Sequence, residues 1–323
     1  MRIITCLLLA SIFFFGCKKN DTPATQSTSS EDASSPNQRL CATDEMVQLA
    51  IKSDPFLEQR MQQLEQFTNK YIRVRQGQLN APGVTITIPV VVHVLYNTAE
   101  ENISDAQIQS QIDVLNEDFT LRNSDRSLIP RLFSNVAGDI GVHFILKQTI
   151  RTFSNKKSWP ANDAMKYTQK GGSDGVDPAN NLNIWVCNLQ KYLGYSYYPG
   201  IRPELDGVVV LYKAFGRTGT LAVPYNLGRT ATHEIGHYLN LRHIWGDATC
   251  GTDLVDDTPQ HTTANFGCPA FPHYNSCGNN AVEMTMNYMD YTDDACMFMF
   301  SNGQKSRMLA VVDASGPRAT LPQ

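Results

Sequence analysis

The chain has 323 residues, of which 42% are hydrophobic and 18% are charged. This length and this apolar fraction are sufficient for a substantial buried core, and they exclude a mainly disordered protein. Lys and Arg number 27 against 31 Asp and Glu, so the formal net charge is −4, and the basic residues are scattered along the chain. Both observations argue against nucleic acid as a partner.

The N-terminus is typical of an exported protein. Arg2 precedes the apolar run 3–15, which is shorter than the ~20 residues that a helix needs to cross a bilayer and predicts a signal peptide over residues 1–16. Cys17 follows Gly16 as in a bacterial lipobox, whose cysteine becomes lipidated, although Phe stands at the upstream positions. An ordinary secretory signal is the alternative. We expect a membrane-anchored lipoprotein or a secreted protein, with the lipid as its only membrane attachment.

The elements that follow alternate between helix and strand. Residues 17–38 are polar and predict a flexible tether. Helical spacing over 44–72, broken at Pro55, predicts two helices in a segment 39–80 that precedes the main domain. Ser104 and Gln107 predict a capping box that opens a long amphipathic helix. The further predicted elements are strands over 84–96, 140–147, 182–189 and 207–212 and a helix over 229–240. Beyond this helix we expect little regular structure.

Six cysteines remain once Cys6 and Cys17 are assigned to the leader. Four of them lie close together near the C-terminus, where the oxidising environment of an exported protein favours two disulfides of undetermined connectivity. These four are Cys250, Cys268, Cys277 and Cys296. The other two, Cys41 and Cys187, either form a third disulfide or remain free thiols.

The predicted helix 229–240 carries the chemistry. Its sequence includes His233, Glu234 and His237, and a third imidazole follows at His243. Side chains four residues apart lie on the same face of a helix, so the first two histidines can bind one zinc ion. His243 can join them only if the chain turns sharply near Asn240, a residue type that tolerates the left-handed conformation.

Three imidazoles leave the fourth position of a tetrahedral zinc ion open, as in catalytic rather than structural sites. Glu234 lies beside that position and is predicted to act as the general base and acid of peptide hydrolysis. A closed structural zinc site would give Glu234 no role.

This extended histidine motif resembles that of the metzincin metalloproteases, and its surroundings resemble their pappalysin family. The resemblance extends from about residue 39 to residue 308 and includes the segments 182–186, 228–232 and 287–291. It implies an α+β metzincin fold over residues 81–323. An upper subdomain, to about residue 243, has a twisted mixed sheet, a backing helix and the active-site helix. A lower, irregular, disulfide-bonded subdomain covers 244–323.

The resemblance also implies roles for single residues. Met289 matches the Met-turn beneath the zinc histidines, and Tyr291 matches a tyrosine that stabilises the oxyanion. Asp294 matches an aspartate that selects Arg or Lys after the scissile bond. Cys41 lies in Arg39-Leu40-Cys41-Ala42-Thr43, which resembles the cysteine-switch segment of pappalysin pro-peptides. The thiolate of such a switch fills the fourth zinc position and keeps the enzyme latent.

The loop after the motif is rich in hard oxygen ligands, which are suited to Ca²⁺, although a solvated acidic loop is the alternative. The candidate ligands are Asp253, Asp256, Asp257 and Thr258. The resemblance implies structural calcium in this region.

Together these observations predict an exported zinc-dependent endopeptidase that acts on protein or peptide substrates. We expect it to be made as a latent zymogen that activates itself by cleaving before Arg or Lys within its own pro-segment. The rival prediction is a catalytically silent binding lipoprotein on the cell surface that keeps zinc for stability.

Overall fold

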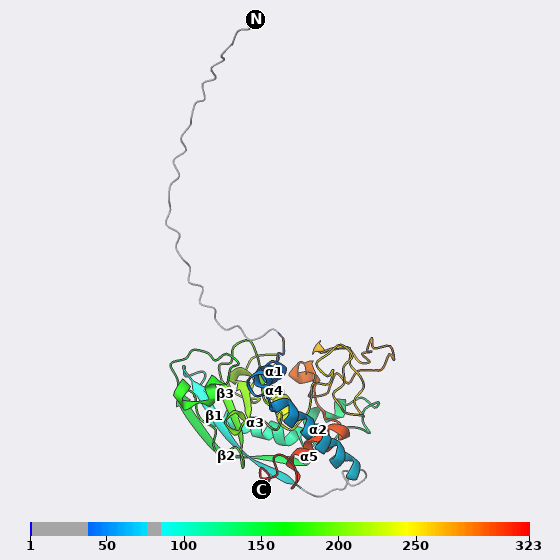
Figure 1. Cartoon of the computed structure of the whole chain (residues 1–323), viewed down its shortest axis with the longest axis horizontal. Coiled ribbons are helices and arrows are strands. Elements are labelled where there is room, and N and C mark those ends of the chain that lie inside the picture. Colours follow the sequence, from blue (N-terminus) through cyan, green and yellow to red (C-terminus); the bar gives the residue numbers. More distant parts are fainter. Residues whose placement is uncertain (2–37, 76–84) are drawn as a thin grey trace. The chain divides into compact units, whose positions relative to one another are not determined.

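The structure is a computed structural model that describes residues 1, 38–75 and 85–323 (Figure 1). The predicted signal peptide and nearly all of the predicted tether lie outside the described residues. Every described helix and strand belongs to one compact unit within residues 35–323. In the described ranges, no helix combines the length and the apolar character that a bilayer span requires.

A five-stranded mixed sheet forms the centre of this unit, with the strand order β2-β1-β3-β5-β4. Its strands are β1 (Ile86–Tyr96), β2 (Val142–Phe153), β3 (Leu182–Cys187), β4 (Gly194–Tyr195) and β5 (Val208–Leu211). All neighbours are parallel except β4, which pairs antiparallel with β5 at the edge. The apolar runs of β3 and β5 are buried along their whole length, as parallel strands covered on both faces should be. The four predicted strands are confirmed, and the two-residue β4 is an addition.

Two helices pack on the sheet and on each other. Helix α3 (Asp105–Asp118) contacts β2, and α4 (Arg229–Tyr238) contacts β5 (Figure 1). The capping box predicted at Ser104 is only half formed. The Ser104 hydroxyl accepts the amide of Gln107, but the Gln107 side chain turns inward and donates to the carbonyls of Tyr212 and Phe215. The Gln107 side chain is therefore used for this long-range contact and is not available to the Ser104 amide.

A buried ion pair joins the two helices. Arg229, at the start of α4, donates to Asp118 Oδ1 at 2.6 Å, and Thr232 donates to Asp118 Oδ2 at 2.7 Å. Tyr288 also donates to Asp118, from the segment that leads into Met289. Burial raises the pKa of Asp118 to about 6, against the opposing effect of the Arg229 charge. Asp118 therefore fixes the first turn of α4 relative to both its neighbouring helix and the chain beneath it.

The chain after His243 is largely irregular and is crosslinked by two disulfides, Cys250–Cys277 and Cys268–Cys296. Its two short strands, β6 (Phe266–Gly267) and β7 (Tyr291–Thr292), pair in parallel. The expectation of little regular structure is wrong for the C-terminal end, where α5 (Asn302–Val312) forms. Ser301 and Gln304 make a complete capping box there, a start signal that the sequence analysis overlooked.

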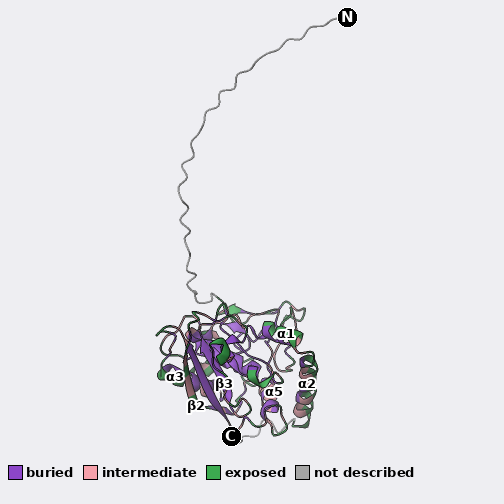
Figure 2. Ribbon diagram, turned by 60° about the vertical axis from the view of Figure 1, so that its left-hand side comes forward, coloured by how far each residue is buried: buried purple, intermediate pink, exposed green. Residues whose placement is uncertain are grey.

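The N-terminal segment 39–75 folds against this body. Helices α1 (Thr43–Ser53) and α2 (Leu57–Val74) are separated at Pro55 as predicted, and they present exposed residues outward (Figure 2). Helix α2 packs on α5, where Glu65 forms an ion pair with the buried guanidinium of Arg307.

The Asp118–Arg229 pair generates a stability prediction. Asp118→Ala leaves a buried guanidinium without its main partner and should lower the free energy of unfolding by about 3–5 kcal/mol. The neighbouring Glu117→Ala is the matched control, because the Glu117–Arg217 pair is partly exposed and should contribute about 0–1 kcal/mol. Urea unfolding of both variants measures the difference. Equal losses would contradict the assignment of Asp118 as a structural anchor.

Candidate active site

Helix α4 places two imidazoles on one face. Nε2 of His233 and Nε2 of His237 lie 3.2 Å apart, and both rings are buried. The helix then ends in a Schellman motif. Leu241 donates its amide to the carbonyl of Gly236, and Asn240 adopts the left-handed conformation with φ of 72°. The turn predicted at Asn240 is confirmed, and it reverses the chain so that His243 can approach the helix.

His243 completes the cluster, with its Nε2 3.1 Å from Nε2 of His237. Tetrahedral zinc with bonds of about 2.0 Å requires its nitrogen ligands to be about 3.3 Å apart, so the spacing of these nitrogens fits that ion. Cys41 Sγ belongs to the same group, whose ligand atoms all lie within 4.8 Å of one another. It is the one such group of His, Cys, Asp and Glu among the described residues.

The three rings are held in the tautomer that a metal ligand needs. Their Nδ1 atoms face the carbonyls of Tyr288 and Leu241 and the carboxylate of Asp247, so each Nδ1 carries the proton and each Nε2 keeps a free lone pair. Burial lowers the pKa of His237 to about 3, so this ring is neutral at physiological pH.

Glu234 lies between the histidines and the N-terminal segment. Its Oε2 accepts hydrogen bonds from Cys41 Sγ and Thr43 Oγ1, each at 3.3 Å. Burial raises the pKa of Glu234 to about 8, although these two hydrogen bonds oppose the shift. The carboxylate also touches the edge strand, because a Cβ at Gly194 would lie 2.8 Å from Cγ of Glu234. Gly194 therefore makes the room that Glu234 occupies.

Met289 and Tyr291 both lie close to the helix that carries His233 and His237. A Cβ at Gly236 would lie 2.4 Å from the sulfur of Met289, so this methionine packs directly beneath α4. The ring of Tyr291 contacts those of His243 and Trp245 at centroid distances of 4.9 and 4.7 Å. Tyr291 therefore contacts the histidine cluster directly, and Met289 packs against the helix that carries two of its members.

The segment around Cys41 runs along the outer edge of the sheet as an added strand. Leu193 donates its amide to the carbonyl of Leu40, and Ala42 donates to the carbonyl of Gly194, in parallel with β4. The Tyr291 hydroxyl reaches the backbone of Cys41 at 3.3 Å. Cys41 and Cys187 are both free, so the third disulfide that the sequence left open is not formed. Cys187 is buried within β3.

Asp294 is fully buried beside the cluster, and its partner is Arg39, two residues before Cys41. Asp294 Oδ1 pairs with the guanidinium, while Oδ2 accepts the amide of Leu227 at 2.8 Å. Arg39 belongs to the motif that predicts the cysteine switch, but the sequence alone indicated no separate role for it. The sequence feature that could have drawn attention to Arg39 is its place two residues before Cys41.

The guanidinium of Arg39 has further partners around Asp294. Its Nε donates to the carbonyl of Thr292 at 3.0 Å, and Nη1 donates to Thr230 Oγ1 at 3.3 Å. The ring of Tyr225 lies 5.2 Å from the guanidinium carbon, within cation–π range. This pocket therefore offers a carboxylate, a carbonyl, a hydroxyl and an aromatic face to one planar cation.

The four residues proposed for calcium do not form one cluster. Thr258 Oγ1 donates to both oxygens of Asp253 at 2.9 Å, and burial raises the pKa of Asp253 to about 7. Asp257 instead accepts the amide of Gly303 at 2.8 Å and so caps α5, and Asp256 is exposed. Only Asp253 and Thr258 are brought together.

Comparison with known proteins bears on this site. The family model described as pregnancy-associated plasma protein-A matches residues 172–313. An extracellular metalloprotease of Arthroderma otae is 34% identical over 239 residues, which cover 69% of this chain and 76% of the relative. Extracellular metalloprotease 1 of Coccidioides posadasii is 34% identical over 244 residues, covering 72% and 78%.

Solved structures agree with the sequences. Mature mirolysin of Tannerella forsythia, in complex with a cleaved peptide, is 45% identical with a TM-score of 0.72, covering 74% of this chain and 96% of mirolysin. A promirolysin mutant from the same organism is 42% identical with the same TM-score and covers 82% of this chain and 95% of promirolysin. The fold, the histidine cluster and these matches lead to one conclusion: the chain belongs to the pregnancy-associated plasma protein-A, or pappalysin, family of metzincin zinc metalloendopeptidases.

Proposed function

We propose that this chain is the latent form of an exported endopeptidase that cleaves before Arg or Lys, with residues 39–75 as its inhibitory pro-segment. The observation that carries the proposal is the pair of contacts made by Arg39 and Cys41. Two residues apart, they reach the basic-side-chain pocket at Asp294 and the histidine cluster at the same time.

In the proposed reaction, His233, His237 and His243 would hold a zinc ion, which when bound would supply a Lewis acid for the substrate carbonyl and lower the pKa of a water molecule. Glu234 takes the proton of the attacking water and later delivers it to the leaving amine. Tyr291 donates its hydroxyl to the carbonyl oxygen as that oxygen gains charge. The position of Tyr291 Oη beside the Cys41 backbone supports this role, because it lies where another peptide backbone would have to pass.

Arg39 supports the proposed specificity, because its side chain occupies the position proposed for the arginine of a substrate. Its guanidinium meets acceptors at Asp294, Thr292 and Thr230. A buried carboxylate that must be paired favours a cationic side chain over a neutral one. Arg matches these acceptors with its planar fork, whereas the ammonium of Lys is a single point of charge. We therefore propose a preference for Arg, followed by Lys.

Latency is argued from Cys41. Its sulfur lies within reach of the three imidazoles, accepts the amide of Thr43 at 3.3 Å and contacts Glu234, so it competes for the zinc position that catalysis needs open. Helix α2 adds a second attachment at Arg307. The larger share of this chain that aligns with promirolysin than with mature mirolysin, 82% against 74%, agrees with a pro-segment at this end.

Export is supported by the relatives named extracellular metalloproteases. The signal peptide and lipid anchor concern residues outside the described ranges. For calcium, the proposal narrows to Asp253 and Thr258 with the nearby carbonyl of Val255, which lies 3.0 Å from Thr258 Oγ1. The rival of a catalytically silent lipoprotein is not favoured, since Glu234 is present and lies beside the histidines.

The first functional prediction concerns Glu234→Ala. The variant should bind about one zinc per chain, because all three ligands remain, but hydrolysis should fall about 10²- to 10⁴-fold without the acid and base. His237→Ala is the contrasting variant and should lose the metal itself. Zinc content and cleavage of a denatured protein are measured after an added protease has removed the pro-segment, because Glu234→Ala cannot cleave its own. Activity of Glu234→Ala within tenfold of wild type would refute the proposed mechanism.

The second prediction concerns latency. Full-length Cys41→Ala should be active at once or mature faster than wild type, because the sulfur no longer competes for the zinc position. Cys187→Ala is the matched control: it removes the other free cysteine, which is buried in β3 away from the cluster, and should stay as latent as wild type. Cleavage of a fluorogenic peptide is followed alongside intact mass. A fully latent Cys41→Ala protein would contradict the switch.

The third prediction concerns specificity. Asp294→Asn keeps an acceptor for the Leu227 amide but removes the charge, so cleavage before Arg and Lys should fall roughly ten- to a hundredfold while cleavage before neutral residues is spared. Asp293→Asn is the neighbouring control. A peptide library digested by the matured enzyme, with mass spectrometry of the new N-termini, gives the profile. Wild-type cleavage mainly before apolar residues would overturn the assignment of Asp294.

A further inference from the structure

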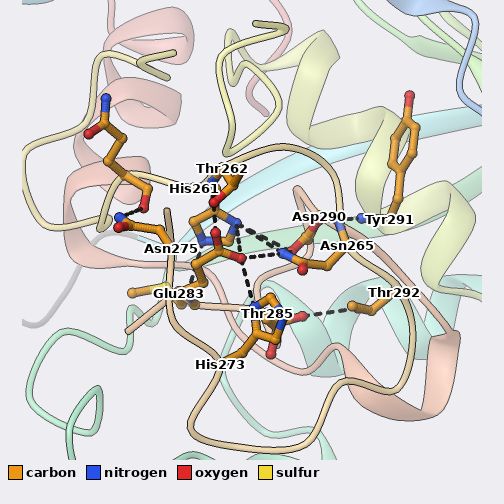
Figure 3. A network of polar contacts seen from close by, with 12 residues as sticks. His261, Thr262, Asn265, His273, Asn275, Glu283, Thr285, Asp290, Tyr291 and Thr292 are labelled. Carbon is orange, nitrogen blue, oxygen red and sulfur yellow. Dashed lines mark hydrogen bonds and ion pairs between the residues drawn. The ribbon is translucent and has the colours of Figure 1, made fainter. Parts of the chain in front are cut away.

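A buried polar network adjoins the main chain of Tyr291 (Figure 3). Its members come from the disulfide-bonded chain between residues 250 and 296. Two carboxylates, those of Glu283 and Asp290, are 1% and 0% exposed, and the imidazole of His261 is 0% exposed. Nothing in the proposed reaction uses these groups, although burying them is costly unless each is fully hydrogen-bonded.

Asp290 connects the two short strands of this region. Its Oδ1 accepts the amide of the adjacent Tyr291 and the amide of Asn265, both at 2.8 Å. Its Oδ2 accepts the side-chain amide of Asn265 at 3.0 Å. Asn265 immediately precedes Phe266, which is the β-pairing partner of Tyr291. One carboxylate therefore holds the backbone on both sides of the β6–β7 pair.

Asn265 is itself held by a second carboxylate. Its side-chain amide also donates to Glu283 Oε2 at 2.8 Å, and Glu283 Oε1 accepts the amide of Thr262 at 2.7 Å. His273 lies 3.0 Å from the same Oε2. Burial raises the pKa of Glu283, but the hydrogen bonds it accepts outweigh this effect, so the group is ionised at neutral pH. Asn265 is thus fixed between two anions and has little freedom to turn.

The state of His261 follows from its backbone partner. The amide of Met284 can only donate, and it lies 2.9 Å from Nε2 of His261, so this nitrogen must be the acceptor. The proton of the neutral ring is consequently on Nδ1, which faces Asp290 Oδ2 at 3.5 Å. His261 therefore directs a polar N–H group, and not a charged ring, toward Asp290.

The position of Tyr291 Oη depends on this backbone. Within the described residues, its ring is bounded by the rings of Trp245, Phe266 and the histidines, contacts that permit sliding more readily than hydrogen bonds do. Besides the β6–β7 pairing, the polar restraint on its main chain is the carboxylate of Asp290. A misplacement of a reacting group by about 1 Å can cost about 10²-fold in rate.

We propose that Asp290 is a positioning residue for catalysis, which sets the Tyr291 hydroxyl over the zinc site and is supported by Asn265, Glu283 and His261. The inference rests on the role of Tyr291 proposed above. It assigns the buried network a function in turnover that is separate from holding the fold together.

A double-mutant cycle tests this assignment. Asp290→Asn, Tyr291→Phe and the double variant are made in the full-length chain and assayed after maturation on a peptide with Arg after the scissile bond. Asp290→Asn should lower kcat about ten- to a hundredfold with KM and zinc content unchanged, because the asparagine presents a donor to the Asn265 amide and loosens the backbone. In the Tyr291→Phe background the same change should cost less than about twofold, since there is no hydroxyl left to misplace.

The cycle separates the two levels of the proposal. An equal loss of kcat from Asp290→Asn in both backgrounds would overturn the positioning role and leave Asp290 a structural residue. If Tyr291→Phe alone retains full kcat, it is the catalytic role of Tyr291 that fails, and the positioning role falls with it. Asn265→Ala provides a second route if Asp290→Asn does not fold. It keeps the backbone hydrogen bonds of Asp290 and should show the same non-additive pattern with a smaller loss.

Discussion

The constraint on which the rest of this structure depends is the convergence of three buried imidazoles, in which Nε2 of His233 and Nε2 of His243 each lie within hydrogen-bond distance of Nε2 of His237. His233 and His237 lie on one face of a helix. His243 can reach them only because the chain reverses after His237, and Asn240 allows this reversal by adopting the left-handed conformation. Three nitrogens whose lone pairs point at one position cannot form hydrogen bonds with one another, because each is an acceptor. They are stable in that arrangement when a cation supplies what they lack, and their Nδ1 partners keep them from turning away.

On the proposed function, the segment before the catalytic body would occupy the surface that a substrate uses. It lies along β4 as an added strand, with Cys41 at the histidines and Arg39 at Asp294. Each contact alone would be a modest anchor in water, but here both occur in a buried setting, where an ion pair must be kept whole because losing one partner leaves the other desolvated. The pair Glu65–Arg307 adds a third anchor on α5. Release therefore has to break several cooperating contacts together.

Local signals in the sequence were sufficient for the parallel strands, the break at Pro55 and the spacing of the three histidines, since each depends on residues close in the chain. The sequence could not reveal that Gln107 turns away from Ser104 to reach carbonyls more than a hundred residues later, or that Asp257 caps α5 instead of joining Asp253. It also could not pair Arg39 with Asp294, because a contact across 255 positions is decided by the fold. Helix α5 was missed although its capping box was legible in the sequence.

On the proposed assignment, Asp294 links specificity and latency. The carboxylate that selects a basic side chain in a substrate is the one that Arg39 occupies in the latent form, so a change that weakens one function weakens the other. A neutral residue at position 294 would leave the buried guanidinium of Arg39 without its counter-ion, and this would destabilise the latent form. Arg39 and Asp294 are therefore expected to change together or not at all. In the latent form Arg39 and Asp294 would thus form one ion pair, and Cys41, two residues after Arg39, would close the zinc position.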